Sequence, residues 1–288
     1  MRGTLLSSLL ELGHATSQNL GFAHRGDVHV SYGEETITET NLLELRRRHP
    51  AIISLKTFGK KSEGLNGADW EWHILGRARK LRMRVQAKRL QRNDRLTIPH
   101  TVASSGKQQI DLLIADAKTY GMKPVYCIYA AENQRAFWAK KGGSIVGDEF
   151  EYGCLLISAY KIKAAMPKAL STIEADCIPW HYLVERRRYS ETKMSGWFKD
   201  GPDLSFLSLF DAVSIVSASA ELTDEPREFP TIDELNAVNL PETTFDGVVE
   251  IGSPEYEFSL PEEAYLERGI TKLVQIDVRD IPPGYPEF

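Results

Sequence analysis

Two segments in which polar and apolar residues alternate, 68–75 and 81–90, constrain the fold of this chain most strongly. Successive side chains of a strand point to opposite faces, so strict alternation predicts two β-strands. The apolar positions are Trp70, Trp72 and Ile74 in the first segment and Leu81, Met83, Val85 and Ala87 in the second. Paired as neighbours across the basic turn 76–80, these strands would form one face that needs a core and one polar face.

The polar face of this predicted strand pair carries a set of residues suited to phosphodiester hydrolysis. Asp69 and Glu71 come from the first strand, and Gln86 and Lys88 from the second. Carboxylate and amide oxygens are hard ligands that Mg²⁺ accepts. A lysine on the same face could orient an attacking water and stabilise developing negative charge. The two-residue spacing of Gln86 and Lys88 is the spacing that a strand requires.

The flanking segments predict an α/β fold with a central mixed sheet. A helix is expected at 34–49 before Pro50, a strand at 51–58, and a second helix at 108–121, followed by a buried strand at 123–130. Together with the strand pair, the order is α-β-β-β-α-β. Beyond residue 131, weaker patterns favour a C-terminal α+β extension with strands in GCLLIS, GVVEIG and KLVQIDV and a docking segment in CIPWHYLV.

The element order and the Asp69 … Gln86-Ala87-Lys88 motif resemble the PD-(D/E)xK restriction-endonuclease-like superfamily, in its Mrr-like variant with a QxK motif. The resemblance covers about residues 30–130 and implies an endonuclease-like core. It implies Mg²⁺ or Mn²⁺ as the cofactor, held by Asp69 and Gln86. The catalytic residues that it implies are Glu35, Asp69, Gln86 and Lys88.

Three features of this motif leave alternatives open. Gly67-Ala68 stands where the family has a proline before the acid. Gln86 replaces an acid, which removes one negative ligand from the metal. The glutamate from the first helix is taken as Glu35, which shares a face with Glu39 at i, i+4. Glu34, Glu39 and Glu71 are the alternatives to Glu35.

The sequence therefore predicts a Mg-dependent deoxyribonuclease that hydrolyses DNA phosphodiester bonds, and the resemblance adds a role in bacterial anti-phage defence. The first alternative is a catalytically inactive nucleic-acid-binding or assembly module of the same fold. The second is a different metal-dependent enzyme or an unrelated α/β interaction protein. Nine Lys/Arg residues and one acid between residues 77 and 95 favour DNA as the partner. The candidate DNA-binding residues are Arg82, Arg84, Arg89 and Arg92.

Bulk composition bounds the remaining possibilities. With 288 residues, 42% of them hydrophobic, the chain can form a nuclease core with an N-terminal helix at 1–165 and an accessory region of unknown role at 166–288. The net charge of −5 argues against a generally basic coat, and from residue 221 onward acids outnumber bases about four to one. Three scattered cysteines predict buried, reduced thiols in a cytoplasmic protein without a membrane span. A homo-oligomer or a defence-system partner protein stays open.

Overall fold

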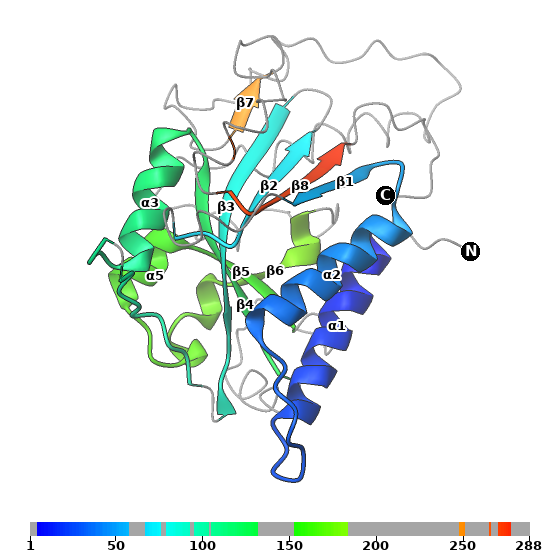
Figure 1. Cartoon of the computed structure of the whole chain (residues 1–288), viewed down its shortest axis with the longest axis vertical. Helices are drawn as coiled ribbons and strands as arrows, with labels where there is room; N and C mark the ends of the chain where they lie inside the picture. The colour runs from blue at the N-terminus through cyan, green and yellow to red at the C-terminus, as the bar shows by residue number, and fades with distance from the viewer. Residues whose placement is uncertain are drawn as a thin grey trace.

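The computed structural model shows a mixed β-sheet flanked by helices (Figure 1). The structure describes residues 5–57, 67–75, 79–92, 95–103, 105–131, 153–183, 248–250, 265 and 270–277. The segment ENQRAFWAKKG, residues 132–142, whose pattern favours a helix, lies outside the described residues, as do residues 184–247.

Eight strands form one sheet in the order β1-β8-β2-β3-β4-β5-β6, with β7 paired to the beginning of β3. The pairs β2–β8 and β3–β4 are parallel, and the other pairs are antiparallel. The strands are β1 (Ile53–Thr57), β2 (Trp70–Leu75), β3 (Arg79–Arg89), β4 (Lys123–Tyr129), β5 (Cys154–Ser158), β6 (Ile178–Pro179), β7 (Val248–Glu250) and β8 (Lys272–Asp277).

The predicted α-β-β-β-α-β order is confirmed by α2 (Glu34–Arg48), β1, β2, β3, α3 (Gln109–Thr119) and β4. The α/β class and the mixed sheet are confirmed with it. One feature of the sheet was not predicted: β8, near the end of the chain, lies between β1 and β2. The sheet therefore takes strands from both sides of the expected domain boundary at residue 165.

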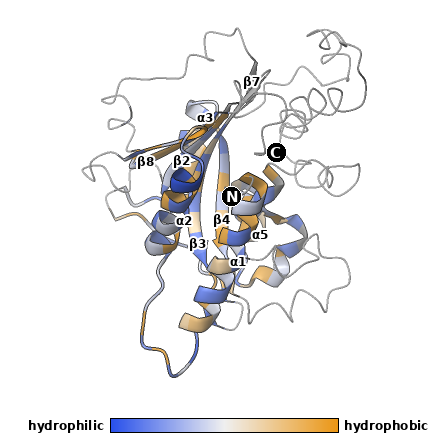
Figure 2. Ribbon diagram, turned by 90° about the vertical axis from the view of Figure 1, so that its right-hand side faces the viewer, coloured by the Kyte–Doolittle hydropathy of each residue, from blue (hydrophilic) through white to orange (hydrophobic). Residues whose placement is uncertain are grey.

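Two layers of side chains cover the sheet. The apolar face of the β2–β3 pair, including Trp72 and Val85, packs in one cluster with α2 and with the leucines of α1 (Leu5–Ala23). On the other face a second cluster joins β4 and β5 to α3 and α5 (Ala159–Ala165). Figure 2 shows both polar and apolar stretches along the helices, as expected for elements with one buried face.

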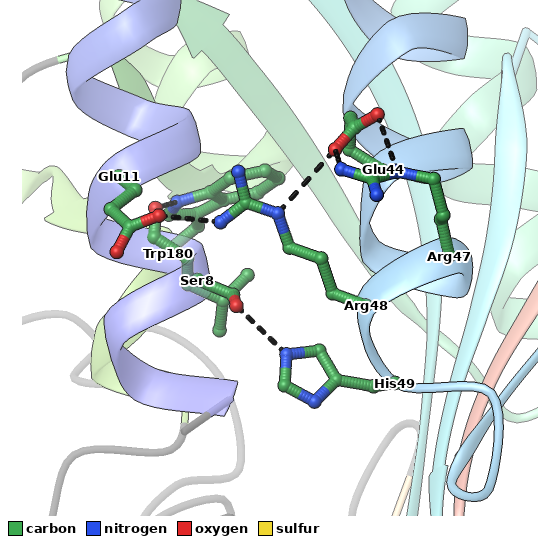
Figure 3. Close-up of polar contacts among 8 residues, drawn as sticks. Ser8, Glu11, Glu44, Arg47, Arg48, His49 and Trp180 are labelled. Carbon is green, nitrogen blue, oxygen red and sulfur yellow. Dashed lines mark hydrogen bonds and ion pairs between the residues drawn. The ribbon is translucent and has the colours of Figure 1, made fainter. Parts of the chain in front are cut away.

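Polar contacts join α1 to the C-terminal end of α2 (Figure 3). The Oγ of Ser8 lies 2.8 Å from Nε2 of His49, and Arg48 contacts Glu11 at 2.6 Å and Glu44 at 3.4 Å. The predicted N-terminal helix is confirmed as α1, and these contacts hold it against α2.

The predicted docking segment near residue 180 also packs against α1. It forms β6 and a short 3₁₀ helix, Trp180–Leu183. The indole Nε1 of Trp180 donates a hydrogen bond to the carbonyl oxygen of Leu9 at 2.7 Å, and its ring meets Trp72 edge-on at 6.3 Å. The segment thus closes one end of the apolar core.

The structure also bears on the cysteines and on the question of a membrane-spanning helix. Cys127, Cys154 and Cys177 are buried free thiols, as expected. Among the described residues, no helix combines the length and apolar character needed to cross a bilayer.

Candidate active site

The candidate site forms where β3 extends beyond its neighbour β2. The antiparallel ladder begins with Trp70 opposite Val85, so Gln86 to Arg89 continue on β3 without a β2 partner. Their backbone N–H groups still need acceptors, because an unpaired buried N–H is costly. Asp69 Oδ2 accepts from the N–H of Ala87 at 2.7 Å, and Glu34 Oε1 accepts from the N–H of Arg89 at 3.0 Å. Two carboxylates therefore replace the missing strand along one edge of β3.

Gly67 is needed for the chain to enter β2 in this position. It has a positive φ of 70°, a conformation that favours glycine. A Cβ at this position would overlap the backbone carbonyl oxygen of Gln109 in the first turn of α3. The glycine before Ala68 and Asp69 thus allows the strand to start against the helix, two residues before the carboxylate that the site uses.

Gln86 lies directly beside Asp69. Its Nε2 donates to Asp69 Oδ2 at 2.7 Å and to the carbonyl oxygen of Ala87 at 3.0 Å. These two acceptors orient the amide group, and its Oε1 is buried without a hydrogen-bond partner among the described residues. A buried carbonyl oxygen without a donor is a position that a cation or a water molecule can occupy.

Lys88 completes the group on the same face. Its Nζ lies 4.0 Å from Glu34 Oε2, and its side chain is 13% exposed against 37% for Glu34. The structure thus brings together Asp69, Gln86 and Lys88, three of the four residues that the strand pattern placed on the polar face.

The surroundings of Asp69 raise its pKa from 3.8 to about 6. Burial is the largest cause, because desolvation disfavours the ionised carboxylate. The N–H of Ala87 and the charge of Lys88 act in the opposite direction, whereas the nearby Glu34 raises the pKa further. The carboxyl group therefore titrates close to neutral pH, where a bound cation would favour its ionised form.

The glutamate from α2 is Glu34 and not the predicted Glu35. Side chains of successive residues in an α-helix point in directions about 100° apart, so Glu34 and Glu35 face different surroundings. Glu34 contacts β3 through the N–H of Arg89, whereas Glu35 is exposed. Glu39, which was expected to share a face with Glu35, forms an ion pair with Lys272 of β8 at 3.4 Å.

Of the four arginines predicted to bind DNA, Arg84 is buried in an ion-pair network, whereas Arg82 is only partly buried. Arg84 is 1% exposed and forms ion pairs with Glu71, at 3.1 Å, and with Asp116 of α3. Its guanidinium is thus buried between two carboxylates, and this also explains why Glu71 does not complete the candidate site. Arg82 donates to the carbonyl oxygens of Tyr120, at 2.9 Å, and Gly121, at 3.4 Å, just beyond the end of α3.

Arg89 and Arg92 lie beyond the site at the end of β3. The guanidinium of Arg89 donates to the carbonyl oxygen of Tyr32 at 3.0 Å, and that of the exposed Arg92 donates to the carbonyl oxygen of Arg25 at 3.1 Å. Both arginines therefore line the segment that connects α1 to α2, close to Glu34.

The donor set around Asp69 is compatible with Mg²⁺, although it is sparse. In the part of the chain that the structure describes, no three or more His, Cys, Asp or Glu side chains are grouped to hold a metal ion. Mg²⁺ commonly uses only one or two protein carboxylates and keeps several waters. Asp69 and Glu34 are the carboxylates present, and Gln86 Oε1 is a third oxygen.

Comparison with known proteins places the chain in a family without assigning an activity. No curated protein matches the sequence. The profile of a family of unknown function, DUF6615, matches residues 6–276, which include the whole candidate site and all but one residue each of α1 and β8. The chain therefore belongs to this family of unknown function (DUF6615).

Proposed function

We propose that this protein is a metal-dependent endonuclease that hydrolyses phosphodiester bonds of DNA. The observation that supports it best is the grouping of an acid, an amide and a lysine at the open end of β3. Gln86 Nε2 lies 2.7 Å from Asp69 Oδ2, and Lys88 lies on the same face, next to Glu34. The resemblance of the QxK motif and of the α-β-β-β-α-β order to PD-(D/E)xK nucleases points to the same chemistry.

Each residue of the cluster has a distinct part in this proposal. Asp69 and Gln86 Oε1 would hold a Mg²⁺ or Mn²⁺ ion, with Glu34 as an additional carboxylate. When bound, the ion would polarise a phosphoryl oxygen and lower the pKa of a coordinated water. Lys88 would orient the attacking water and stabilise the charge that develops on the phosphate. The water oxygen forms a bond to phosphorus and the P–O bond to the leaving sugar oxygen breaks. The proton that the water releases to solvent is balanced by the proton that the leaving oxygen takes up from solvent.

Exposed Arg92 and partly buried Arg89 would help hold the DNA backbone beside the cluster. A cytoplasmic role in defence against foreign DNA belongs to the same proposal and is supported by the resemblance alone.

Plasmid cleavage tests the proposal. Purified full-length protein is incubated with supercoiled plasmid and Mg²⁺ or Mn²⁺, in parallel with Lys88→Ala and Lys118→Ala. Lys118 is an exposed lysine in the last turn of α3 and is the matched control for loss of a positive charge. We expect metal-dependent nicking that falls by about 10²- to 10³-fold in Lys88→Ala, the size of effect typical for loss of one stabilising group, and that persists in Lys118→Ala.

A second candidate function is a DNA-binding module that does not cleave. The hydrogen bond from Gln86 Nε2 to Asp69 favours it, because the neutral amide satisfies the carboxylate without a metal. Salt-sensitive DNA binding with unchanged plasmid, in both Mg²⁺ and Mn²⁺, would support this module and contradict the endonuclease. Absence of DNA binding would contradict both functions.

A further inference from the structure

The C-terminal strand β8 reaches the candidate site from the side opposite β3. β8 runs parallel to β2, with Leu273 opposite Glu71. In this register Thr271 is the residue beside Asp69, and Lys272 follows it in the chain. The Oγ1 of Thr271 donates to the carbonyl oxygen of Asp69 at 3.0 Å. The start of β8 is therefore tied to the residue that carries the central carboxylate.

Lys272 brings a second ammonium group to this region. Its side chain is 15% exposed, and its Nζ lies 3.4 Å from Oε1 of Glu39 on α2. Its positive charge lowers the pKa of Asp69, as does the charge of Lys88. Asp69 is thus influenced by one lysine from β3 and by another from β8, about 180 residues further along the chain.

The ion pair between Lys272 and Glu39 has one largely buried partner and one exposed partner. The Glu39 side chain is 55% exposed. An ion pair with one exposed partner contributes little to stability, because water and salt screen it. A DNA phosphodiester carries one negative charge, as a carboxylate does, and a lysine binds it as a compact point charge whose three N–H donors can contact more than one anion.

We propose that Lys272 is a phosphate-binding residue of the candidate site, supplied by the C-terminal strand. The inference rests on the proposed function for the identity of the phosphate, which is that of a DNA strand. Lys272 would contact a backbone phosphate from the β8 side while Lys88 contacts the reacting phosphate from the β3 side. The strand β8 then does more than extend the sheet: it contributes a positive charge from outside residues 30–130.

The structural alternative is that Lys272 serves only as the ion-pair partner of Glu39. Two variants separate these roles. Lys272→Met removes the charge and keeps most of the aliphatic side chain. Glu39→Gln breaks the same ion pair but leaves Lys272 charged and free to bind phosphate. If the ion pair alone mattered, both variants would behave alike.

The readout is the affinity of the full-length protein for a fluorescent DNA duplex in EDTA, measured by anisotropy over a range of KCl concentrations. Each phosphate contact made by a cation adds close to one to the slope of log affinity against log salt. We expect Lys272→Met to reduce this slope by about one and to weaken binding several-fold. Glu39→Gln should leave the slope unchanged, and Lys272→Arg should restore it.

Several outcomes would overturn the inference, and they can be told apart from failure of the proposed function. An unchanged slope in Lys272→Met, or equal effects of Lys272→Met and Glu39→Gln, would show that Lys272 does not bind phosphate, even if the wild type cleaves DNA. A reduced slope without cleavage by the wild type would keep Lys272 as a phosphate contact and contradict the nuclease. If Lys272→Met does not fold, Lys272→Gln gives the same comparison. Absence of DNA binding by the wild type would overturn both proposals.

Discussion

The polar face of the β2–β3 pair has two ends that arise from the same sequence pattern and differ in their surroundings. At one end Arg84 lies between Glu71 and Asp116 and is 1% exposed. At the other end Gln86 Oε1 has no hydrogen-bond partner among the described residues, and Lys88 stands 4.0 Å from its nearest carboxylate oxygen. One end is a closed ion-pair network, and the other keeps groups available to a ligand.

The difference follows from what covers each end. Asp116 of α3 closes the network at Arg84, where β2 is fully paired with β3. At the other end β2 has not yet begun, and side chains in place of a strand satisfy the edge of β3. Alternation alone thus places charged residues on one face, and the neighbouring elements decide which of them become structural.

The largest effect is expected from removing the charge of Arg84 at the closed end. Arg84→Met would remove the guanidinium that lies between the carboxylates of Glu71 and Asp116, and removal of one partner from a buried ion pair costs about 3–5 kcal/mol. We expect a loss of unfolding free energy of this size in urea denaturation. Arg92→Met, at an exposed arginine, is the control and should change it by less than about 0.5 kcal/mol. A loss of unfolding free energy below about 1 kcal/mol in Arg84→Met would contradict the description of Arg84 as part of a closed ion-pair network.

Substitution of Glu34 and of Glu35 tests which of these two glutamates belongs to the open end. Glu34→Gln keeps an acceptor for the N–H of Arg89 and removes one negative charge from the cluster, so we expect Mn²⁺ affinity to fall about tenfold. Glu35→Gln should leave the affinity within about twofold. Titration calorimetry of both variants measures the Mn²⁺ affinity. An equal loss of affinity in the two variants would contradict the assignment of Glu34 over Glu35.

The stability difference between Asp69→Asn and the wild type should depend on pH. Because the folded-state pKa of Asp69 is raised to about 6 from 3.8, its neutral form is favoured by folding. This stabilisation is present below about pH 4 and is lost as the pH rises through 6. Asparagine stays neutral, so in EDTA the variant should be more stable than the wild type by about 1–2 kcal/mol at pH 8, after allowance for partial exposure. The difference should shrink toward pH 4.

Urea denaturation at several pH values would measure this difference, with Asp27→Asn at an exposed aspartate as the control. A constant difference between pH 4 and pH 8 would contradict the raised pKa of Asp69. Cleavage by the wild type, which requires the ionised carboxylate in the proposed mechanism, should increase with pH on passing 6.

The smallest effect is expected at the surface beside the open end. Arg92→Ala should reduce the salt slope of DNA binding by about one and weaken binding only several-fold. Arg84→Lys keeps the buried cation and provides the comparison, since it should leave the slope unchanged. An equal change in both variants would contradict the division of the polar face into a closed and an open end.

Much of the fold was predictable because its patterns are local. The period-2 alternation at 68–75 and 81–90 predicted β2 and β3, and turn and helix signals located α2 and α3. The two-residue spacing of Gln86 and Lys88, with Asp69 at the start of the neighbouring strand, was enough to predict that these three side chains meet.

Other features depend on contacts between residues far apart in the chain. The choice of Glu34 over Glu35 is set by the angle at which α2 approaches β3, and one helical position changes the direction by about 100°. The position of β8 between β1 and β2 could not be read from the short strand KLVQID, because nothing local specifies its partner.

The sequence by itself determined the order of the elements, the two faces of the β2–β3 pair and the presence of an acid, an amide and a lysine on one of them. Only the tertiary structure decided that Arg84 is buried, that Glu34 contacts the end of β3 and that β8 begins beside Asp69. The physical reason is that strand periodicity is a property of neighbouring residues, whereas burial and charge pairing depend on which distant elements pack together.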